Sequence, residues 1–152
     1  MIDKSKAVCF SGHRLIEKDF DAVKLYNVIE NYINKGMTYF LCGMALGFDT
    51  LVFKTLEKLR KNHDIKIIAC VPCRNQSEKY NFLQKKEYDR MISVADEVIV
   101  LNEKYTVYCM MQRNKYMVDN SSYLIVYYRN LKGGTYNTLK YALEQDINIE
   151  YV

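Results

Sequence analysis

The feature of this sequence that most constrains its fold is a regular alternation between short apolar runs and segments with helical periodicity. The runs IKIIACV (65–71) and YLIVYY (123–128) are apolar throughout, whereas a strand with one solvated face alternates apolar and polar residues. Between such runs, residues recur at helical spacing, as Leu25, Val28, Ile29 and Ile33 do. Strands buried on both faces and joined by helices predict βαβ units in a mostly parallel sheet.

The alternation predicts the order of elements along the whole chain. Gly36 follows the first helical segment as a C-terminal cap would, and Gly133-Gly134 opens the last helix. A further helix is expected from about 107 to 119. The expected strands span 7–10, 37–42, 65–71, 97–101 and 123–128, with a short closing strand at 147–152. We therefore expect an α/β fold: a three-layer Rossmann-like domain with a mostly parallel sheet of five to six strands, occupying residues 1–152 as a single domain.

Composition excludes several other classes of protein. With 49% hydrophobic residues, 26% charged residues and one proline, the chain is too apolar to be intrinsically disordered. We expect no membrane span, because no apolar run approaches the roughly 20 residues required. The N-terminal segment lacks the long apolar core of a secretory signal, and the five cysteines are scattered through apolar segments. We therefore expect reduced cysteines and a cytoplasmic location.

The loops that follow the expected strands carry the residues most suited to a ligand. They are Ser11-Gly12-His13-Arg14, the segment 43–49, the segment 72–76 and the segment 132–135. Ligands of such sheets bind at the carboxyl ends of the strands, and glycine there lets the backbone approach a phosphate. Arginine, histidine, hydroxyl and amide groups in these loops suit a phosphorylated, ribose-bearing ligand. The alternative is that the glycines only make tight turns, since neither G-x-G-x-x-G nor a P-loop is present.

Arg113 and Asn114 are polar residues on the apolar side of the expected helix 107–119. That side also carries Met110, Met111, Met117 and Val118. A buried charge is unfavourable unless it is paired. Arg113 is either a structural partner of Asp119 or Asp49, or it extends over the end of the sheet to a phosphate or carboxylate.

Other polar groups have two interpretations each. His13 is a candidate general acid or base, or a hydrogen-bond donor to a ligand, and with only one other histidine we expect no metal site. The C-x-x-C pair Cys70 and Cys73 is an isolated motif, so a redox or metal role is disfavoured. The net charge of +4 is mild and the tyrosines form no stacking stripe, so nucleic acid is an unlikely partner.

Taken in order, these loops resemble a known family. The segments FSGHR, CGMALGFDTL, PCRNQ, YCMMQRNKYMVDNSSYLIVYY and KGGTYNTLKYAL are similar to those of the SLOG superfamily in its YpsA-like branch. The resemblance covers nearly the whole chain. It implies a Rossmann-like fold related to the LOG phosphoribohydrolases and to the DNA-processing protein DprA, and binding of nucleotides or of derivatives such as ADP-ribose or NAD. We also expect a homodimer, because LOG relatives pair through their helices and apolar surface for two subunits to share is offered by Met110, Met111, Met117 and the many tyrosines.

The chain departs from its catalytic relatives at one motif. LOG enzymes carry P-G-G-x-G-T-x-x-E, and depending on whether Thr138 or Thr135 matches the motif threonine, the glutamate position here is Tyr141 or Thr138. Cleavage of an N-glycosidic bond favours a nearby carboxylate, for which Asp49 and Asp119 are the candidates.

The sequence thus predicts a sensor or sequestering module for a nucleotide-derived small molecule, with hydrolysis of a nucleotide N-glycosidic bond as the alternative, so enzymatic activity is left open. No further cofactor is expected. A DNA-binding partner of the DprA kind is a third, less favoured hypothesis. The predicted ligand-binding residues lie in the loops and on the helix described above: Ser11, Gly12, His13, Arg14, Gly43, Ala45, Gly47, Asp49, Arg113, Asn114, Gly133, Gly134 and Thr135.

Overall fold

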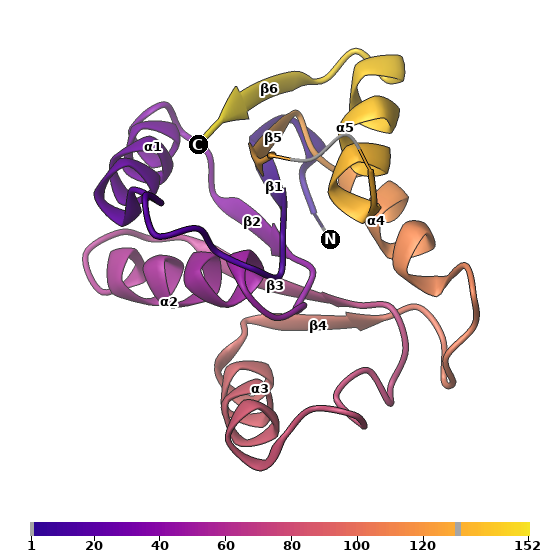
Figure 1. Ribbon diagram of the computed structural model, residues 1–152. Coiled ribbons are helices and arrows are strands. Elements are labelled where there is room, and N and C mark those ends of the chain that lie inside the picture. The colour runs from indigo at the N-terminus through magenta and orange to yellow at the C-terminus, as the bar shows by residue number, and fades with distance from the viewer. Residues whose placement is uncertain (1, 130–131) are drawn as a thin grey trace.

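A single parallel sheet forms the middle layer of the molecule in the computed structural model, which describes residues 2–129 and 132–152 (Figure 1). Within those residues the sheet has six strands in the order β4-β3-β2-β1-β5-β6. All adjacent strands run parallel. The strands are β1 (Ala7–Gly12), β2 (Tyr39–Cys42), β3 (Lys66–Val71), β4 (Glu97–Val100), β5 (Tyr123–Tyr127) and β6 (Asn148–Tyr151). This confirms the predicted α/β class.

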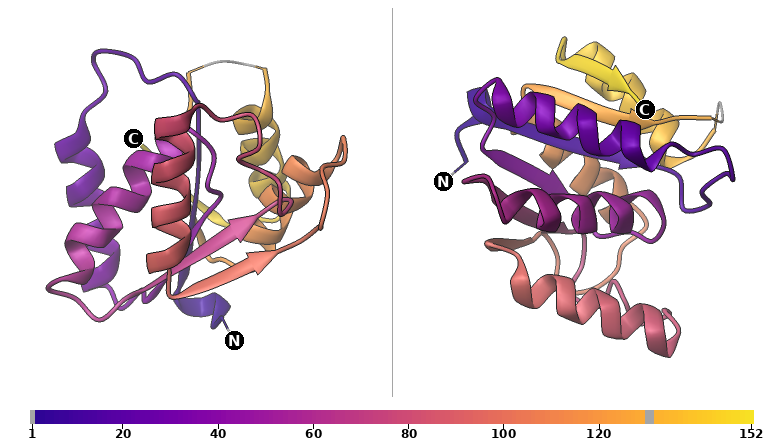
Figure 2. Two further views of the ribbon diagram at one scale, coloured as in Figure 1. Left: turned by 90° about the horizontal axis from the view of Figure 1, so that it is seen from below. Right: turned by 90° about the vertical axis from the view of Figure 1, so that its left-hand side faces the viewer.

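Helices cover both faces of the sheet, as the apolar strands require (Figure 2). On one face lie α1 (Ala22–Asn34), α2 (Phe48–Arg60) and α3 (Phe82–Val94), packed over a core that includes Phe10, Phe40 and Phe53. On the other face lie α4 (Cys109–Asp119) and α5 (Gly134–Glu144), over a smaller core that includes Leu41 and Leu124. Alternate residues of each central strand therefore point into different cores. No helix among the described residues is long and apolar enough to cross a membrane.

Local signals explain where the helices begin and end. Asp21 caps α1 by accepting a hydrogen bond from the backbone N–H of Lys24, at 2.9 Å. Asn81 and Gln84 form a reciprocal capping box at the start of α3. Gly36 lies just beyond α1 with a φ of 101°, which confirms the predicted C-terminal glycine.

Where the expected bounds differ from the observed ones, the difference is one or two residues. The second strand begins at Tyr39 rather than at residue 37. The backbone of Thr38 bonds to Lys6, just before β1, and to Lys66, the first residue of β3. The fourth helix begins at Cys109 rather than at about 107, after the turn in which the N–H of Cys109 bonds to the carbonyl of Thr106. The first strand extends to Gly12 rather than ending at residue 10, pairing with β5 as far as Tyr127.

The sheet changes direction of winding between β1 and β5. The chain moves outward from β1 through β2 and β3 to β4, then returns across the sheet through α4 to place β5 on the other side of β1. The chain therefore passes from β1 to α1 on one face of the sheet and from β5 to α5 on the other. Open α/β sheets bind ligands at the carboxyl ends of the strands where the winding reverses in this way.

We predict that Gly36→Ala destabilises the fold. The left-handed backbone at position 36 disfavours a side chain by about 1–2 kcal/mol, although a Cβ there would meet nothing within 4 Å. Urea unfolding at 25 °C measures the loss, with Asn34→Ala, an exposed substitution in the last turn of α1, as the control. Equal midpoints for the two variants would contradict this explanation of the cap.

Candidate functional site

A cavity of about 350 Å³ lies at the carboxyl end of the sheet, beyond the end of β1. This volume lies within the range of about 300–1,000 Å³ that is usual for small-molecule sites. The cavity brings together residues from the loops after β1 and β2, from α4 and from the start of α5. The predicted residues that line it are Ser11, Gly12, His13, Arg14, Ala45, Asp49, Arg113, Asn114, Gly134 and Thr135. Gly43, Gly47 and Gly133 do not line it, but Gly43 lies against Arg113 and Gly47 against Arg14, both of which do.

Arg113 is fixed in the cavity wall by a backbone carbonyl. The side chain is 5% exposed. Its Nη1 donates a hydrogen bond to the carbonyl oxygen of Gly43, and its Nε donates to Oδ1 of Asn114 at 2.7 Å. A Cβ at position 43 would lie 2.8 Å from Nη1, so the arginine needs glycine there. The strand-end glycine and the buried arginine are thus one structural unit.

No carboxylate of the described residues forms an ion pair with Arg113. The expectation of a structural pair with Asp119 or Asp49 is therefore wrong. Asp119 lies outside the cavity lining and accepts a hydrogen bond from the hydroxyl of Tyr141, at 2.7 Å. Asp49 is close enough for Arg113 to influence its ionisation, but the two form no salt bridge. Arg113 thus brings a cationic group to the wall of the cavity.

Asp49 contributes a carboxyl group with one open acceptor. It lies in the first turn of α2 and is 7% exposed. Its Oδ2 accepts a hydrogen bond from the backbone N–H of Ala45 at 3.1 Å, whereas Oδ1 is buried without a partner among the described residues. Burial raises the pKa of Asp49 to about 6, although the charge of Arg113 and the Ala45 hydrogen bond act in the opposite direction. The group therefore changes charge close to neutral pH.

His13 is held as a neutral ring. Its Nε2 accepts a hydrogen bond from the backbone N–H of Arg129 at 2.8 Å, so the proton of the neutral ring resides on Nδ1. Burial lowers the pKa of His13, and the charge of Arg129 lowers it further. The ring packs edge-on against Tyr127, with centroids 5.6 Å apart. His13 thus presents an N–H donor at neutral pH.

Two helices begin at the edge of the cavity without a side-chain cap. Gly47 precedes α2 with a φ of 81°, and Gly133 precedes α5 with a φ of 94°. The backbone of Arg14 passes so close to Gly47 that a Cβ there would collide with it, and the N–H of Phe48 donates to the carbonyl of His13 at 3.1 Å. Uncapped helix N-termini have the N–H groups and the positive dipole end that favour anions.

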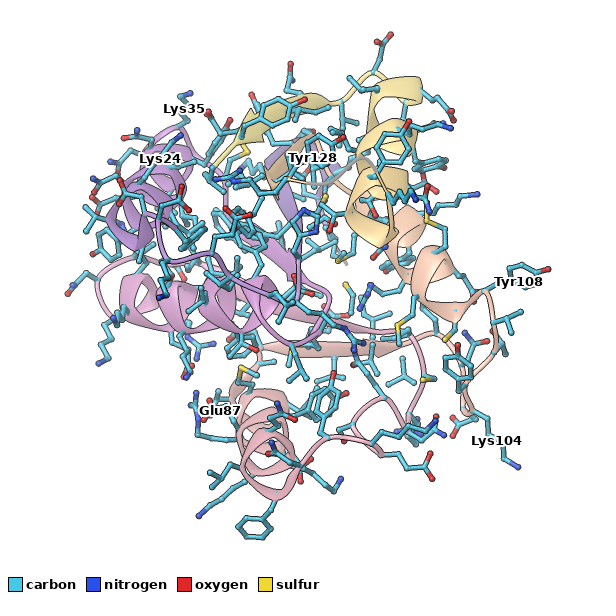
Figure 3. The ribbon with its side chains drawn as sticks, viewed as in Figure 1. Lys24, Lys35, Glu87, Lys104, Tyr108 and Tyr128 are labelled. Atoms are coloured by element: carbon cyan, nitrogen blue, oxygen red, sulfur yellow. The ribbon has the colours of Figure 1, made fainter. Side chains whose placement is uncertain are left out.

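Several residues of α4 lie elsewhere than predicted. Met110 and Met111 are partly exposed rather than inward, and Cys109 takes the buried position instead. Met117 is 2% exposed in the core, so it contributes nothing to the surface expected to join two subunits. Tyr108, just before α4, is 77% exposed and projects away from the molecule (Figure 3).

Sequence reasoning missed the role of Gln76. This buried amide donates through Nε2 to the carbonyl of Gly43 at 3.2 Å and accepts from the hydroxyl of Tyr88 at 3.0 Å. Gln76 lies in the segment 72–76 that the sequence marked as a candidate loop, but nothing in the local pattern distinguishes this amide from its neighbours. Phe10 and Met110 also line the cavity. The cysteines are free and buried, and no group of three potential metal ligands occurs among the described residues.

We predict that Asp49→Asn changes the pH dependence of stability. Since the folded state raises the pKa of Asp49 from 3.8 to about 6, wild-type protein loses stability as pH rises from about 4 to about 6. The variant lacks this loss and is more stable than wild type at pH 7, by about 1–3 kcal/mol. Urea unfolding of both proteins at pH 4, 5, 6 and 7 measures the difference. A difference that stays constant over this range would contradict the raised pKa.

Comparisons with known proteins give both a family and a fold. A sequence profile for YpsA, described as the YspA SLOG family, matches residues 18–151. The chain is 38% identical to the uncharacterized SPbeta prophage-derived protein YoqJ of Bacillus subtilis, and the similarity covers 78% of each chain.

Two solved structures of DNA processing protein A share the fold. The protein from Streptococcus pneumoniae superimposes with a TM-score of 0.73 at 20% identity, covering 97% of this chain and 50% of that one. The protein from Helicobacter pylori, described for its single-stranded DNA binding mode, superimposes with a TM-score of 0.70 at 16% identity. That match covers 97% of this chain and 65% of the other, so the chain spans only part of either structure.

Proposed function

This chain belongs to the YspA SLOG family, and from that premise we propose that it binds a nucleotide-derived small molecule in the cavity at the carboxyl end of β1. The observation that carries the proposal is the buried guanidinium of Arg113, which lines the cavity without an ion pair among the described residues. Burying an unpaired charge is unfavourable, whereas a bound phosphate would accept hydrogen bonds from its remaining N–H groups. Such a site fits a sensor or a sequestering module.

The other groups of the cavity suit the remaining parts of a nucleotide. The N-terminus of α5, with Gly134 and Thr135, faces the cavity from beside Asn114 and offers backbone N–H groups to a phosphate. The open Oδ1 of Asp49 suits a ribose hydroxyl, which would donate the hydrogen bond that this oxygen lacks. The neutral ring of His13 supplies a further donor.

Single-stranded DNA is the competing ligand, because the Helicobacter pylori protein is described as binding it. This finding weakens our expectation that nucleic acid is an unlikely partner. The small molecule is favoured by the position of the charge: Arg113 lies inside a cavity of about 350 Å³ and is 5% exposed, whereas phosphate contacts to a long strand need basic groups on an open surface. An oligonucleotide therefore belongs in the binding assays.

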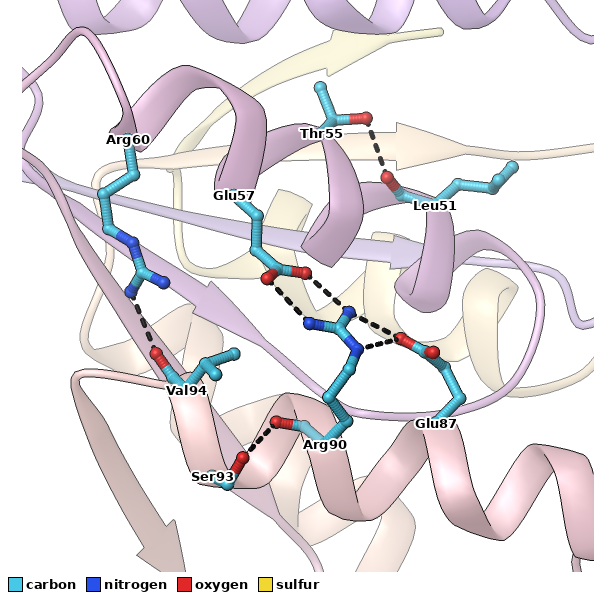
Figure 4. Close-up of polar contacts among 8 residues, drawn as sticks. All are labelled: Leu51, Thr55, Glu57, Arg60, Glu87, Arg90, Ser93 and Val94. Atoms are coloured by element: carbon cyan, nitrogen blue, oxygen red, sulfur yellow. Dashed lines mark hydrogen bonds and ion pairs between the residues drawn. The ribbon is translucent and has the colours of Figure 1, made fainter.

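We predict that Arg113→Ala abolishes binding of AMP, ADP-ribose and NAD while the fold survives. Calorimetry with each of these ligands and with an oligonucleotide measures the effect, and circular dichroism checks the fold. Arg90→Ala is the matched control. Arg90 on α3 bonds to Glu57 at 2.8 Å and to Glu87 at 2.6 Å, and it does not line the cavity (Figure 4).

Unchanged affinity in Arg113→Ala would contradict the proposed phosphate site. If only the oligonucleotide binds, and its affinity falls steeply with salt concentration as phosphate contacts require, the ligand is DNA and not a small molecule. Native mass spectra of the same samples give the number of subunits and so test the expected homodimer.

Hydrolysis of the ligand is the second candidate function, and Asp49 is the observation that favours it. A carboxyl with a pKa of about 6 and a free oxygen in a cavity is suited to general acid–base chemistry near neutral pH. We predict that, if the protein is a hydrolase, free base appears from AMP or NAD and that Asp49→Asn lowers its rate by at least about 100-fold. Mass spectrometry distinguishes intact ligand from base and sugar phosphate. If the ligand is still intact after prolonged incubation, the hydrolase hypothesis is wrong and the binding function stands.

A further inference from the structure

A second cavity, of about 480 Å³, lies beside the first along the carboxyl edge of the sheet. Its walls come from the loop between β3 and α3 and from the loop between β4 and α4, which contribute Tyr80 and Tyr105. Arg14 and Met110 line both cavities, so the two spaces adjoin at these side chains. The edge of the sheet therefore presents two neighbouring compartments.

The Gly43 carbonyl joins the walls of the two compartments. It accepts one hydrogen bond from Arg113, which lines the first cavity, and one from Gln76, which lines the second. Gln76 is 8% exposed and is held in turn by Tyr88. A ligand in either cavity thus lies against side chains that are anchored to the same backbone atom.

Hydrogen bonds and an ion pair join the two loops that form the second cavity. The N–H of Arg74 donates to the carbonyl of Asn102 at 2.9 Å, and the Arg74 side chain pairs with Glu103 at 2.8 Å. The N–H of Tyr105 donates to Oδ1 of Asn75 at 3.1 Å. The backbone of Tyr105 is therefore fixed while its side chain stays 59% exposed. A preformed space of this kind loses little entropy when it binds a ligand.

Positive charge lies where the two cavities meet. Arg14 is exposed at the junction, and its charge acts on Tyr80, whose pKa is nevertheless raised by burial. Arg113 in the first cavity also acts on Tyr80. Two guanidinium groups that act on one tyrosine suit a ligand with more than one phosphate charge, placed between the compartments.

We propose that the second cavity is a subsite for the second half of a two-part nucleotide: a planar aromatic ring, joined through a diphosphate at Arg14 to the nucleoside in the first cavity. The ring would stack on Tyr105. This inference rests on the proposed function, because it needs the first cavity to hold a nucleotide. It adds that a mononucleotide fills only part of the site.

The test compares AMP, which has one ring, with NAD, which has two rings joined by a diphosphate. Calorimetry should show NAD binding at least ten-fold more tightly than AMP. Tyr105→Ala should lower the affinity for NAD by about ten-fold or more, since the stacking of a ring on an aromatic side chain contributes a free energy of this size. The same variant should leave AMP unchanged. Tyr105→Phe, which keeps the ring, should retain the affinity for NAD.

Tyr108→Ala is the matched control, because this tyrosine of the same loop is 77% exposed and lines neither cavity. Its affinities for both ligands should equal those of wild type. If AMP binds but NAD binds no more tightly, or if Tyr105→Ala weakens both equally, the second subsite is wrong and the proposed function stands. If neither ligand binds, or if only an oligonucleotide binds, the proposed function and the subsite fail together.

Discussion

The walls of both cavities at the carboxyl edge of the sheet depend on one backbone carbonyl, that of Gly43 just after β2. A peptide carbonyl has two lone pairs, and at this position both are used by side chains from distant segments, Arg113 and Gln76. The carbonyl is available because β2 ends at Cys42. The approach is possible because residue 43 has no side chain to obstruct the guanidinium. One glycine thereby sets the positions of α4 and of the loop after β3 relative to the sheet.

The first cavity combines features that lower stability but suit binding. Arg113 is buried without an ion pair, Asp49 has a buried oxygen without a partner, and two helix ends lack a side-chain cap, all within the described residues. In a chain selected for stability alone, the charge, the carboxyl oxygen and the helix ends would each have a partner. The two cores, in contrast, are filled mainly by aliphatic and aromatic side chains. Unpartnered polar groups that gather in one cavity are typical of a functional site.

The sequence predicted the layers and the loops well, because both depend on local signals. Unalternating apolar runs indicated strands buried on two faces, and glycines after the strands indicated the loops that line the cavity. The partners of Arg113 were not predictable, because they depend on which strand ends lie side by side. Gln76 was missed for the same reason, since an amide in a loop has no local pattern. On α4, helical spacing alone did not distinguish Met110 from Cys109 as the buried residue, because the wide apolar face of that helix leaves the rotation open.

The strand order also affects how the chain folds during synthesis. The central strand β1 is synthesised first but pairs on one side with β5, so Cys9 cannot pair with Leu124 until β5 has been synthesised. Until then β1 has no partner on that side, and the face of the sheet that α5 helps to cover is incomplete. Pairings between residues so far apart form slowly, and unpaired edges with uncovered apolar faces promote aggregation. The same crossover that places β5 beside β1 therefore leaves the sheet incomplete until the C-terminal third of the chain has been made.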